Sequence, residues 1–351
     1  MQLASNALPS SQCPRTDNSA QLSRREAIKR VAGVVTTAML PIITESTAAY
    51  GAALEERNEQ KSSNKHTPGL TVATCQFPVS ADCARNARYT RSFMHKAAAK
   101  GAHLFHTSEA CLTGYGGEDI PSFDNDKYDW GALRGHTRGL RELAQSLHFW
   151  LVLGSAHFLD QDVKPTNCLY LIDPQGQIVN RYDKCFLTDD DQQVYSAGDR
   201  LVQHDTRGVK IGLAICYDLC YPQLYIAYRE AGVQVMLHSF YNGGDSERDY
   251  EATLNVRQAP TRCADNRLWA VCNNTSKPYF QWGAFIARPD ATIPKQLPIN
   301  QPGMLIHDFP DGLSKGGWFP CVLPMKKRDD EIMFLGTPVG HPRRLNGRSE
   351  A

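Results

Sequence analysis

The stretch VKIGLAICYD, residues 209–218, decides how the fold of this chain is interpreted. Its first seven residues are mostly apolar and partly β-branched, which predicts a buried strand over 209–215. Cys216 follows directly, and α/β folds place their reacting groups beyond the carboxyl end of a strand. Cys216 is therefore a candidate nucleophile, although a buried cysteine without partners is more often an inert apolar residue. Partners elsewhere in the chain decide between the two interpretations.

Length and composition indicate an ordinary globular protein. The 351 residues carry a net charge of +1, with 42% hydrophobic and 21% charged residues, enough for one large domain or two modest ones. The basic residues are scattered, which argues against a nucleic-acid partner. No apolar run reaches the length of about eighteen residues that spans a membrane. The eleven cysteines show neither CxxC pairs nor zinc-ligand spacing, so we expect free thiols and no metal.

The first 68 residues are predicted to be a leader and linker rather than part of the fold. The segment SRREAIK, residues 23–29, precedes a short apolar stretch and small residues near Ala49, an order typical of an export signal. The paired arginines favour a twin-arginine signal, although Ala27 occupies a position where such signals usually carry Phe. We expect an exported protein, in the bacterial periplasm or secreted. The alternative is a cytoplasmic protein with a disordered leader.

Residues 69–325 are predicted to form one α/β domain with two similar halves. A strand–helix–glycine–strand pattern occurs at 70–107 and again at 209–239. Each half is expected to form one sheet with helices on its outer face, and residues 326–351 a charged tail. The expected strands are 70–77, 103–107, 150–157, 167–173, 178–182, 209–215, 233–239, 268–271, 283–288 and 304–309, and the expected helices are 82–100, 131–147, one after Pro222, and 247–266.

Three residues with complementary chemistry fall at the ends of expected strands. Glu109 follows the second strand of the first half, Lys184 follows the hairpin strand 178–182, and Cys216 follows the first strand of the second half. Attack on an amide carbonyl needs a nucleophile, a proton carrier and a positive group for the developing oxyanion. A thiol, a carboxylate and an ammonium group supply these functions. Taken singly, Glu109 and Lys184 are ordinary loop charges.

Around these residues the chain resembles the carbon–nitrogen hydrolase (nitrilase) superfamily. The segment LFHTSEACLTGY at 104–115 is similar to the family's apolar strand, glutamate and small-Gly-Tyr turn. The segment YDKCFL at 182–187 is similar to its lysine motif, and GLAICYD at 212–218 to its nucleophile motif. The motifs occur in the family's order, and the resemblance covers about residues 70 to 310.

The resemblance implies a four-layer α-β-β-α sandwich with pseudo-symmetric halves, which often forms a homodimer or a higher homo-oligomer. It implies Cys216 as nucleophile, Glu109 as general base and Lys184 as oxyanion stabiliser, aided by the backbone N–H of Tyr217. The reaction passes through a thioester that water hydrolyses, and no metal or organic cofactor takes part. The expected function is hydrolysis of a small linear amide or N-carbamoyl compound.

Two departures from the family pattern affect the predicted site. The family carries a second glutamate after the lysine, and here Asp191, which is one methylene shorter, lies in the best register. Asp191 either takes that role or is a solvated loop residue. The usual arginine and glutamate after the nucleophile are Cys220 and Gln223, so the rim of the site differs. The substrate is therefore not transferred from any well-known branch of the family.

Further candidates and alternatives remain open. Tyr115 and Tyr217 are candidate substrate-binding residues because they lie in the motifs around the site. His238 is a further candidate on the next expected strand, but it suits a core or loop equally well. One alternative function is a nitrilase that attacks C≡N through a thioimidate. Another is a catalytically silent binding protein with the same fold. The intact set of glutamate, lysine and cysteine argues against a silent protein.

Overall fold

The structure is a computed structural model of the chain, and it describes residues 68–123, 128–160, 162–243, 251–278, 282–310 and 313. Residues 1–67 of the predicted leader and linker, 1–68, and the whole predicted charged tail, 326–351, lie outside the described residues; Pro68 is the first residue of β1. Within those described ranges, no helix has the length and apolar character that a membrane span requires.

Twelve strands and six helical segments make up the described part of the chain. The strands are β1 Pro68–Gln76, β2 Leu104–His106, β3 Trp150–His157, β4 Thr166–Ile172, β5 Ile178–Asp183, β6 Gln203–Thr206, β7 Val209–Ile215, β8 Val235–Ser239, β9 Trp269–Asn273, β10 Phe285–Ala287, β11 Lys295–Gln296 and β12 Gly303–Pro310. The helices are α3 Cys83–Ala99, α4 Trp130–Leu147, α5 Asp191–Val194, the 3₁₀ helix η1 Cys216–Cys220, α6 Pro222–Glu230 and α7 Glu251–Asn266.

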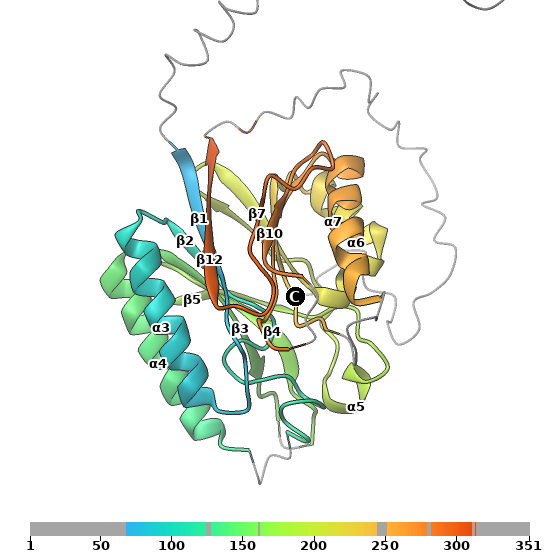
Figure 1. Cartoon of the computed structure of the whole chain (residues 1–351). Coiled ribbons are helices and arrows are strands. Elements are labelled where there is room, and N and C mark those ends of the chain that lie inside the picture. Colours follow the sequence, from blue (N-terminus) through green and yellow to red (C-terminus); the bar gives the residue numbers. More distant parts are fainter. Residues whose placement is uncertain are drawn as a thin grey trace, which may run out of the picture. The chain divides into compact units, whose positions relative to one another are not determined.

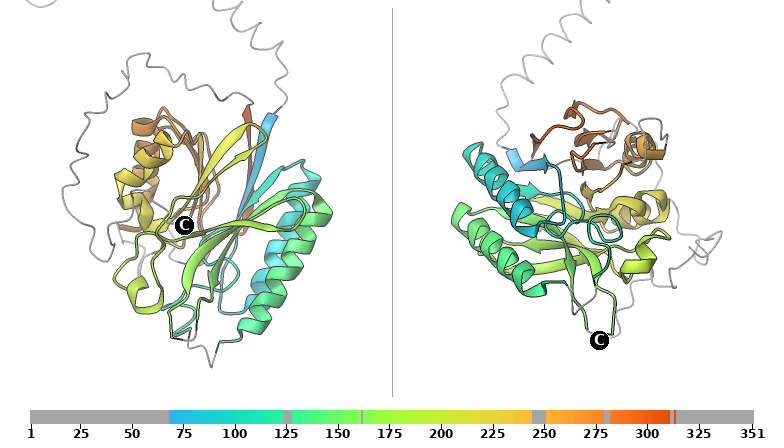
Figure 2. Two further views of the ribbon diagram at one scale, coloured as in Figure 1. Left: turned by 180° about the vertical axis from the view of Figure 1, so that it is seen from behind. Right: turned by 60° about the horizontal axis from the view of Figure 1, so that its bottom comes forward.

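Two six-stranded mixed sheets lie in the middle of the domain, with α3 and α4 on one side and α6 and α7 on the other (Figures 1 and 2). The strand orders are β12-β1-β2-β3-β4-β5 and β6-β7-β8-β9-β10-β11. In each sheet three parallel strands are flanked by one strand on one side and two on the other, and each flanking strand pairs antiparallel with its inner neighbour. The predicted four-layer sandwich with pseudo-symmetric halves is therefore confirmed.

Both faces of the central strands β2 and β3 of the first sheet are buried, as their sequences indicate. Leu104 and Val152 belong to the core that also contains Ile211 and Leu213 of the second sheet. Phe105, Leu151 and Leu153, which alternate with these residues along β2 and β3, belong to a second core that includes residues of α3 and α4. Successive strand residues point to opposite faces, so a sheet covered on both sides needs continuous apolar runs. Each such buried side chain contributes about 1.5–3 kcal/mol.

The expected strands and helices agree with the observed ones to within two residues, except at the start of α7. That helix was expected from residue 247 and begins at Glu251, after residues that the structure does not describe. Strands β6 and β11 were not predicted. Both lie at sheet edges and consist largely of polar, exposed residues, which leave no apolar periodicity to detect.

Candidate active site

The three predicted residues come together beyond the ends of three strands. Glu109 lies in the turn after β2, Lys184 directly after β5 and Cys216 directly after β7. The Nζ atom of Lys184 is 2.8 Å from Oε1 of Glu109, and both side chains are fully buried. Burial raises the pKa of the half-buried Cys216 thiol; the charge of Glu109 raises it further, and Lys184 lowers it. The thiol thus lies within electrostatic range of both charges.

Asp191 supplies a second carboxylate to the same lysine. Its Oδ2 atom is 2.7 Å from the Nζ atom of Lys184, and its side chain is also fully buried. The Tyr115 hydroxyl donates to Oδ1 at 2.6 Å, and the backbone N–H of Thr188 donates to Oδ2 at 3.0 Å. Although Asp is shorter than Glu, the first turn of α5 brings its carboxylate into contact with the ammonium group.

The two carboxylates differ in how readily they take a proton. Burial raises the pKa of Glu109, and Lys184 offsets only part of this effect. Burial also acts to raise the pKa of Asp191, but Lys184 and the Tyr115 hydroxyl outweigh it, so the pKa is lowered. Burial acts to lower the pKa of Lys184, but the two carboxylates raise it well above its usual value. Of the two carboxylates, Glu109 is therefore the one that takes up a proton more readily, and Asp191 the one that stays ionised to lower pH.

Two residues that the sequence did not single out hold the carboxylate of Glu109. The side-chain amide of Asn167 donates to Oε1 at 2.7 Å, and the backbone N–H of Tyr241 donates to Oε2 at 2.8 Å. The carbonyl of Asn167 also accepts the N–H of Lys184 at 2.8 Å. Asn167 follows Thr166 at the start of β4, whose remaining residues are mostly apolar, and this buried polar position was the available signal for Asn167. Tyr241 lies in the chain just after the end of β8, and Glu109 lies in the chain just after the end of β2.

Cys216 lies at a sharp turn held by Asp218. Its φ of 43° is in the left-handed region, which costs a residue other than glycine about 1–3 kcal/mol and is common at active sites. The Oδ2 atom of Asp218 accepts the Ile215 N–H at 2.8 Å and the Tyr182 hydroxyl at 2.7 Å, and Oδ1 accepts the Phe186 N–H at 2.9 Å. Asp218 thereby joins the cysteine turn to the chain on both sides of the lysine.

We expect Asp218→Asn to destabilise this turn. Burial raises the pKa of Asp218 to about 6, and all three of its partners are donors. An asparagine must point its NH₂ group at one of them, so the free energy of unfolding should fall by about 1–3 kcal/mol. Chemical denaturation measures this loss, and iodoacetamide labelling of Cys216 should become slower. The control is Asp205→Asn on the edge strand β6. Unchanged stability and labelling would contradict this role of Asp218.

Tyr115 forms an aromatic wall beside the charged residues. Its ring stacks on Tyr241 with centroids 4.7 Å apart and an interplanar angle of 14°, and the Lys184 Nζ atom lies 5.8 Å from its centroid. The Tyr241 hydroxyl lies 3.0 Å from a carboxylate oxygen of Glu118 and 2.9 Å from one of Asp119, and its single proton is donated to one of these two acceptors at a time. Tyr241 is therefore held at both ends, by the carboxylate of the site at its N–H and by these two acids at its hydroxyl.

Tyr217 and His238 occupy different surroundings. Tyr217 is partly buried in the first turn of η1, and its ring lies edge-on to Tyr221 at 5.5 Å. His238 is fully buried in β8 and shares a 2.8 Å hydrogen bond between its Nδ1 atom and the Tyr225 hydroxyl. Burial lowers the pKa of His238 to about 3, so its ring is neutral. A substrate-binding role for these residues stays a prediction.

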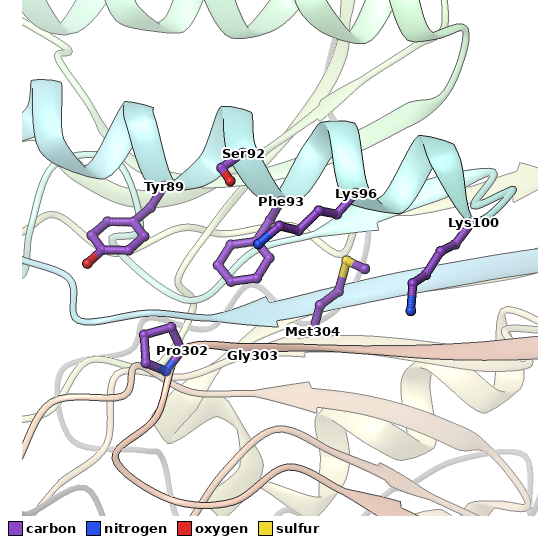
Figure 3. Close-up of a pocket in the computed structure, with 8 residues that line it drawn as sticks. All are labelled: Tyr89, Ser92, Phe93, Lys96, Lys100, Pro302, Gly303 and Met304. Carbon is purple, nitrogen blue, oxygen red and sulfur yellow. The ribbon is translucent and has the colours of Figure 1, made fainter.

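Other potential sites in the described residues are few. They contain no group of three or more His, Cys, Asp or Glu residues arranged to hold a metal ion. The nine cysteines of the described ranges are free thiols. A separate cavity of about 390 Å³ lies between α3 and β12 (Figure 3). It contains none of the predicted site residues, and its lining includes Phe93, Lys96, Lys100 and Met304.

The chain matches a known protein family and is similar to proteins named as amidases. The family model described as carbon-nitrogen hydrolase matches residues 71–314. The deaminated glutathione amidase of Dictyostelium discoideum is 27% identical over 247 residues, which cover 65% of this chain and 79% of the relative. The human omega-amidase is 25% identical over 226 residues, which cover 60% of this chain and 78% of the relative.

Solved structures show a similar fold. An amidase from Nesterenkonia sp. matches with a TM-score of 0.62 at 21% identity, covering 70% of this chain and 91% of that one. In a mutant of that amidase, the acetamide moiety of fluoroacetamide is added covalently at the active site cysteine. A cysteine-to-alanine mutant of the same amidase was solved in complex with butyramide. At this level of identity the likeness concerns the fold.

Proposed function

This chain belongs to the carbon–nitrogen hydrolase family, and from this we propose that it hydrolyses a small linear amide or N-carbamoyl compound through a cysteine thioester. The observation that supports this most directly is one buried lysine held between two carboxylates whose pKa values shift in opposite directions. One carboxylate keeps the lysine charged while the other is able to carry a proton. The amidase names of the sequence relatives support the same reaction class.

In the proposed first half-reaction, Cys216 gives its proton to Glu109 and its sulfur bonds to the carbonyl carbon, while the C=O π electrons move to oxygen. Among the described residues, two of the three N–H groups of Lys184 are engaged, by Glu109 and Asp191, so the third is available to this oxyanion. The backbone N–H of Tyr217 assists it. Glu109 then protonates the nitrogen, the C–N bond breaks, and ammonia or an amine leaves the thioester.

In the second half-reaction water replaces the nitrogen. Glu109, again ionised, removes a proton from water, and the resulting hydroxide bonds to the thioester carbon. The tetrahedral intermediate collapses, the C–S bond breaks, and the thiolate takes the proton back from Glu109. The products are a carboxylic acid and the free thiol. Asp191 stays ionised throughout and keeps Lys184 charged, so the ammonium group of Lys184 stabilises the oxyanion in both half-reactions.

We test this function with the purified full chain and two matched probes, butyramide and butyronitrile. An amidase releases ammonia and butyrate from butyramide, and intact mass of a quenched sample shows the acyl-enzyme. Because burial raises the pKa of Glu109, kcat/KM should fall at acid pH along a limb whose apparent pKa exceeds the 4.5 of an ordinary glutamate. N-carbamoylglycine tests the carbamoyl branch in the same assay.

The alternatives give different results in this assay. A nitrilase consumes butyronitrile and leaves butyramide unchanged. A silent binding protein turns over none of the three probes, and its Cys216 reacts with iodoacetamide no faster than the other cysteines. Either result would contradict the proposed function.

A further inference from the structure

The carboxylate of Glu109 has an asymmetric set of donors. A carboxylate has about four lone-pair sites, two on each oxygen. Oε1 accepts from Lys184 at 2.8 Å and from the Asn167 amide at 2.7 Å. Oε2 accepts the Tyr241 N–H at 2.8 Å and, within the described ranges, nothing else. Both sites on Oε1 are therefore filled, while one site on Oε2 remains available.

The amide orientation of Asn167 follows from its surroundings. If the side chain were flipped, its oxygen would face the carboxylate of Glu109 and repel it, so the NH₂ group must point at Oε1. The other end of the amide, Oδ1, is buried and has no hydrogen-bond partner among the residues that the structure describes. The contact with Glu109 is thus the hydrogen bond that holds this side chain.

Asn167 is placed on a rigid part of the sheet. It is fully buried near the start of β4, opposite Ala156 of β3, and its own carbonyl accepts the N–H of Lys184 at 2.8 Å. One residue therefore contacts the glutamate through its side chain and the lysine through its backbone. Because its amide is neutral and neither gains nor loses a proton near neutral pH, it occupies Oε1 without competing for the transferred proton.

From these contacts we propose that Oε2 of Glu109 is the atom that carries the proton between Cys216 and the leaving nitrogen, and that Asn167 is the positioning residue that reserves Oε1 for structural contacts. This inference rests on the proposed function, because it assigns an atom to the proton transfer of that reaction. In the thioester-forming half, the S–H proton moves to Oε2 and then to nitrogen. In the hydrolytic half, Oε2 receives a proton of water and returns it to the thiolate.

The test compares Asn167→Leu and Asn167→Asp with wild type. Leucine has a similar size and removes the donor, which frees a site on Oε1 and withdraws a hydrogen bond that favours the ionised carboxylate. We expect kcat for butyramide to fall by at least about tenfold with KM little changed, and the acid limb of its pH profile to move to higher pH. The Asn167→Asp variant also places a second negative charge beside Glu109, so the acid limb of its pH profile should move to still higher pH.

A purely structural role predicts a different outcome. In that case activity would fall in proportion to lost stability, and the pH of the acid limb would stay that of wild type. The matched control is Asn180→Leu on the neighbouring strand β5, where Asn180 contacts Arg200 and not Glu109. The acid limb of the pH profile of Asn180→Leu should lie at the same pH as that of wild type. If either Asn167 variant keeps the wild-type kcat and limb, the inference is wrong.

A second readout separates this inference from the proposed function. The rate of iodoacetamide alkylation of Cys216, followed by intact mass against pH, reports proton transfer from the thiol to Glu109 without any turnover of substrate. If wild type hydrolysed no amide, the proposed function would fail while the alkylation profile still tested Asn167. An acid limb of alkylation that is the same in wild type and Asn167→Leu would overturn the positioning role.

Discussion

Cys216→Ala is expected to lower kcat/KM for butyramide by about 10⁴-fold or more, the scale of loss found when a covalent nucleophile is removed. Without the thiol no thioester forms, so water must attack the amide directly. Steady-state kinetics measure the loss. Brief exposure to iodoacetamide near neutral pH should label wild type at one site and leave the variant unlabelled.

The control for this variant is Cys220→Ala, four residues along in the same 3₁₀ helix. Cys220 is also half-buried, but its sulfur contacts the side chain of Gln258 at 3.9 Å. It should keep nearly full activity and the single fast label. The nucleophile assignment would be refuted by a Cys216→Ala enzyme with more than a tenth of wild-type activity, or by abolished activity in Cys220→Ala.

Lys184→Met is expected to lower both activity and stability. The change leaves the carboxylates of Glu109 and Asp191 fully buried without their cation, and such a loss costs about 3–5 kcal/mol. It also removes the charge that stabilises the oxyanion, so we expect kcat/KM to fall by about 10³-fold or more. Denaturant unfolding and steady-state kinetics measure the two effects separately.

The stability loss should depend on pH with a definite sign. Without the lysine, burial and mutual repulsion raise the folded-state pKa values of both carboxylates above their unfolded values. The folded variant then binds more protons than the unfolded chain, so its deficit relative to wild type grows as pH rises from about 4 to 7. Adding Asp191→Asn should restore part of the stability but not the activity. A deficit that is constant with pH would contradict this account.

The control for Lys184→Met is Lys210→Met. Lys210 is partly buried in β7, and its ammonium group donates to the carbonyl of Ala231 at 3.3 Å. It lies on the strand that leads to Cys216 but forms no ion pair with a carboxylate of the site. Its replacement should change stability by less than about 1 kcal/mol and leave the pH dependence as in wild type.

Much of the fold was predictable from the sequence because it depends on local patterns. Continuous apolar runs such as 209–215 predict strands buried on both faces, and turn residues mark their ends. The repeated strand–helix–strand unit predicted two similar halves, which the two sheets confirm. The repeat did not show that β12, at the end of the described chain, corresponds to β6, which precedes β7 in the other sheet. That correspondence arises from pairing between β1 and β12, far apart in sequence.

Some residues of the site were likewise predictable from the sequence, and others are evident only in the structure. The sequence by itself determined that Glu109, Lys184 and Cys216 each follow a strand, because strand ends are local features. It left open whether Asp191 reaches the lysine, and it did not indicate Asn167 or Tyr241. The contacts of Asn167 and Tyr241 with Glu109 join residues 58 and 132 positions apart. All three contacts depend on chain register and side-chain direction to a fraction of an ångström. Only the tertiary structure decides them, because the Glu109 carboxylate accepts hydrogen bonds from a residue of β4 and from residues that follow β5 and β8, and this placement depends on how the sheets pair.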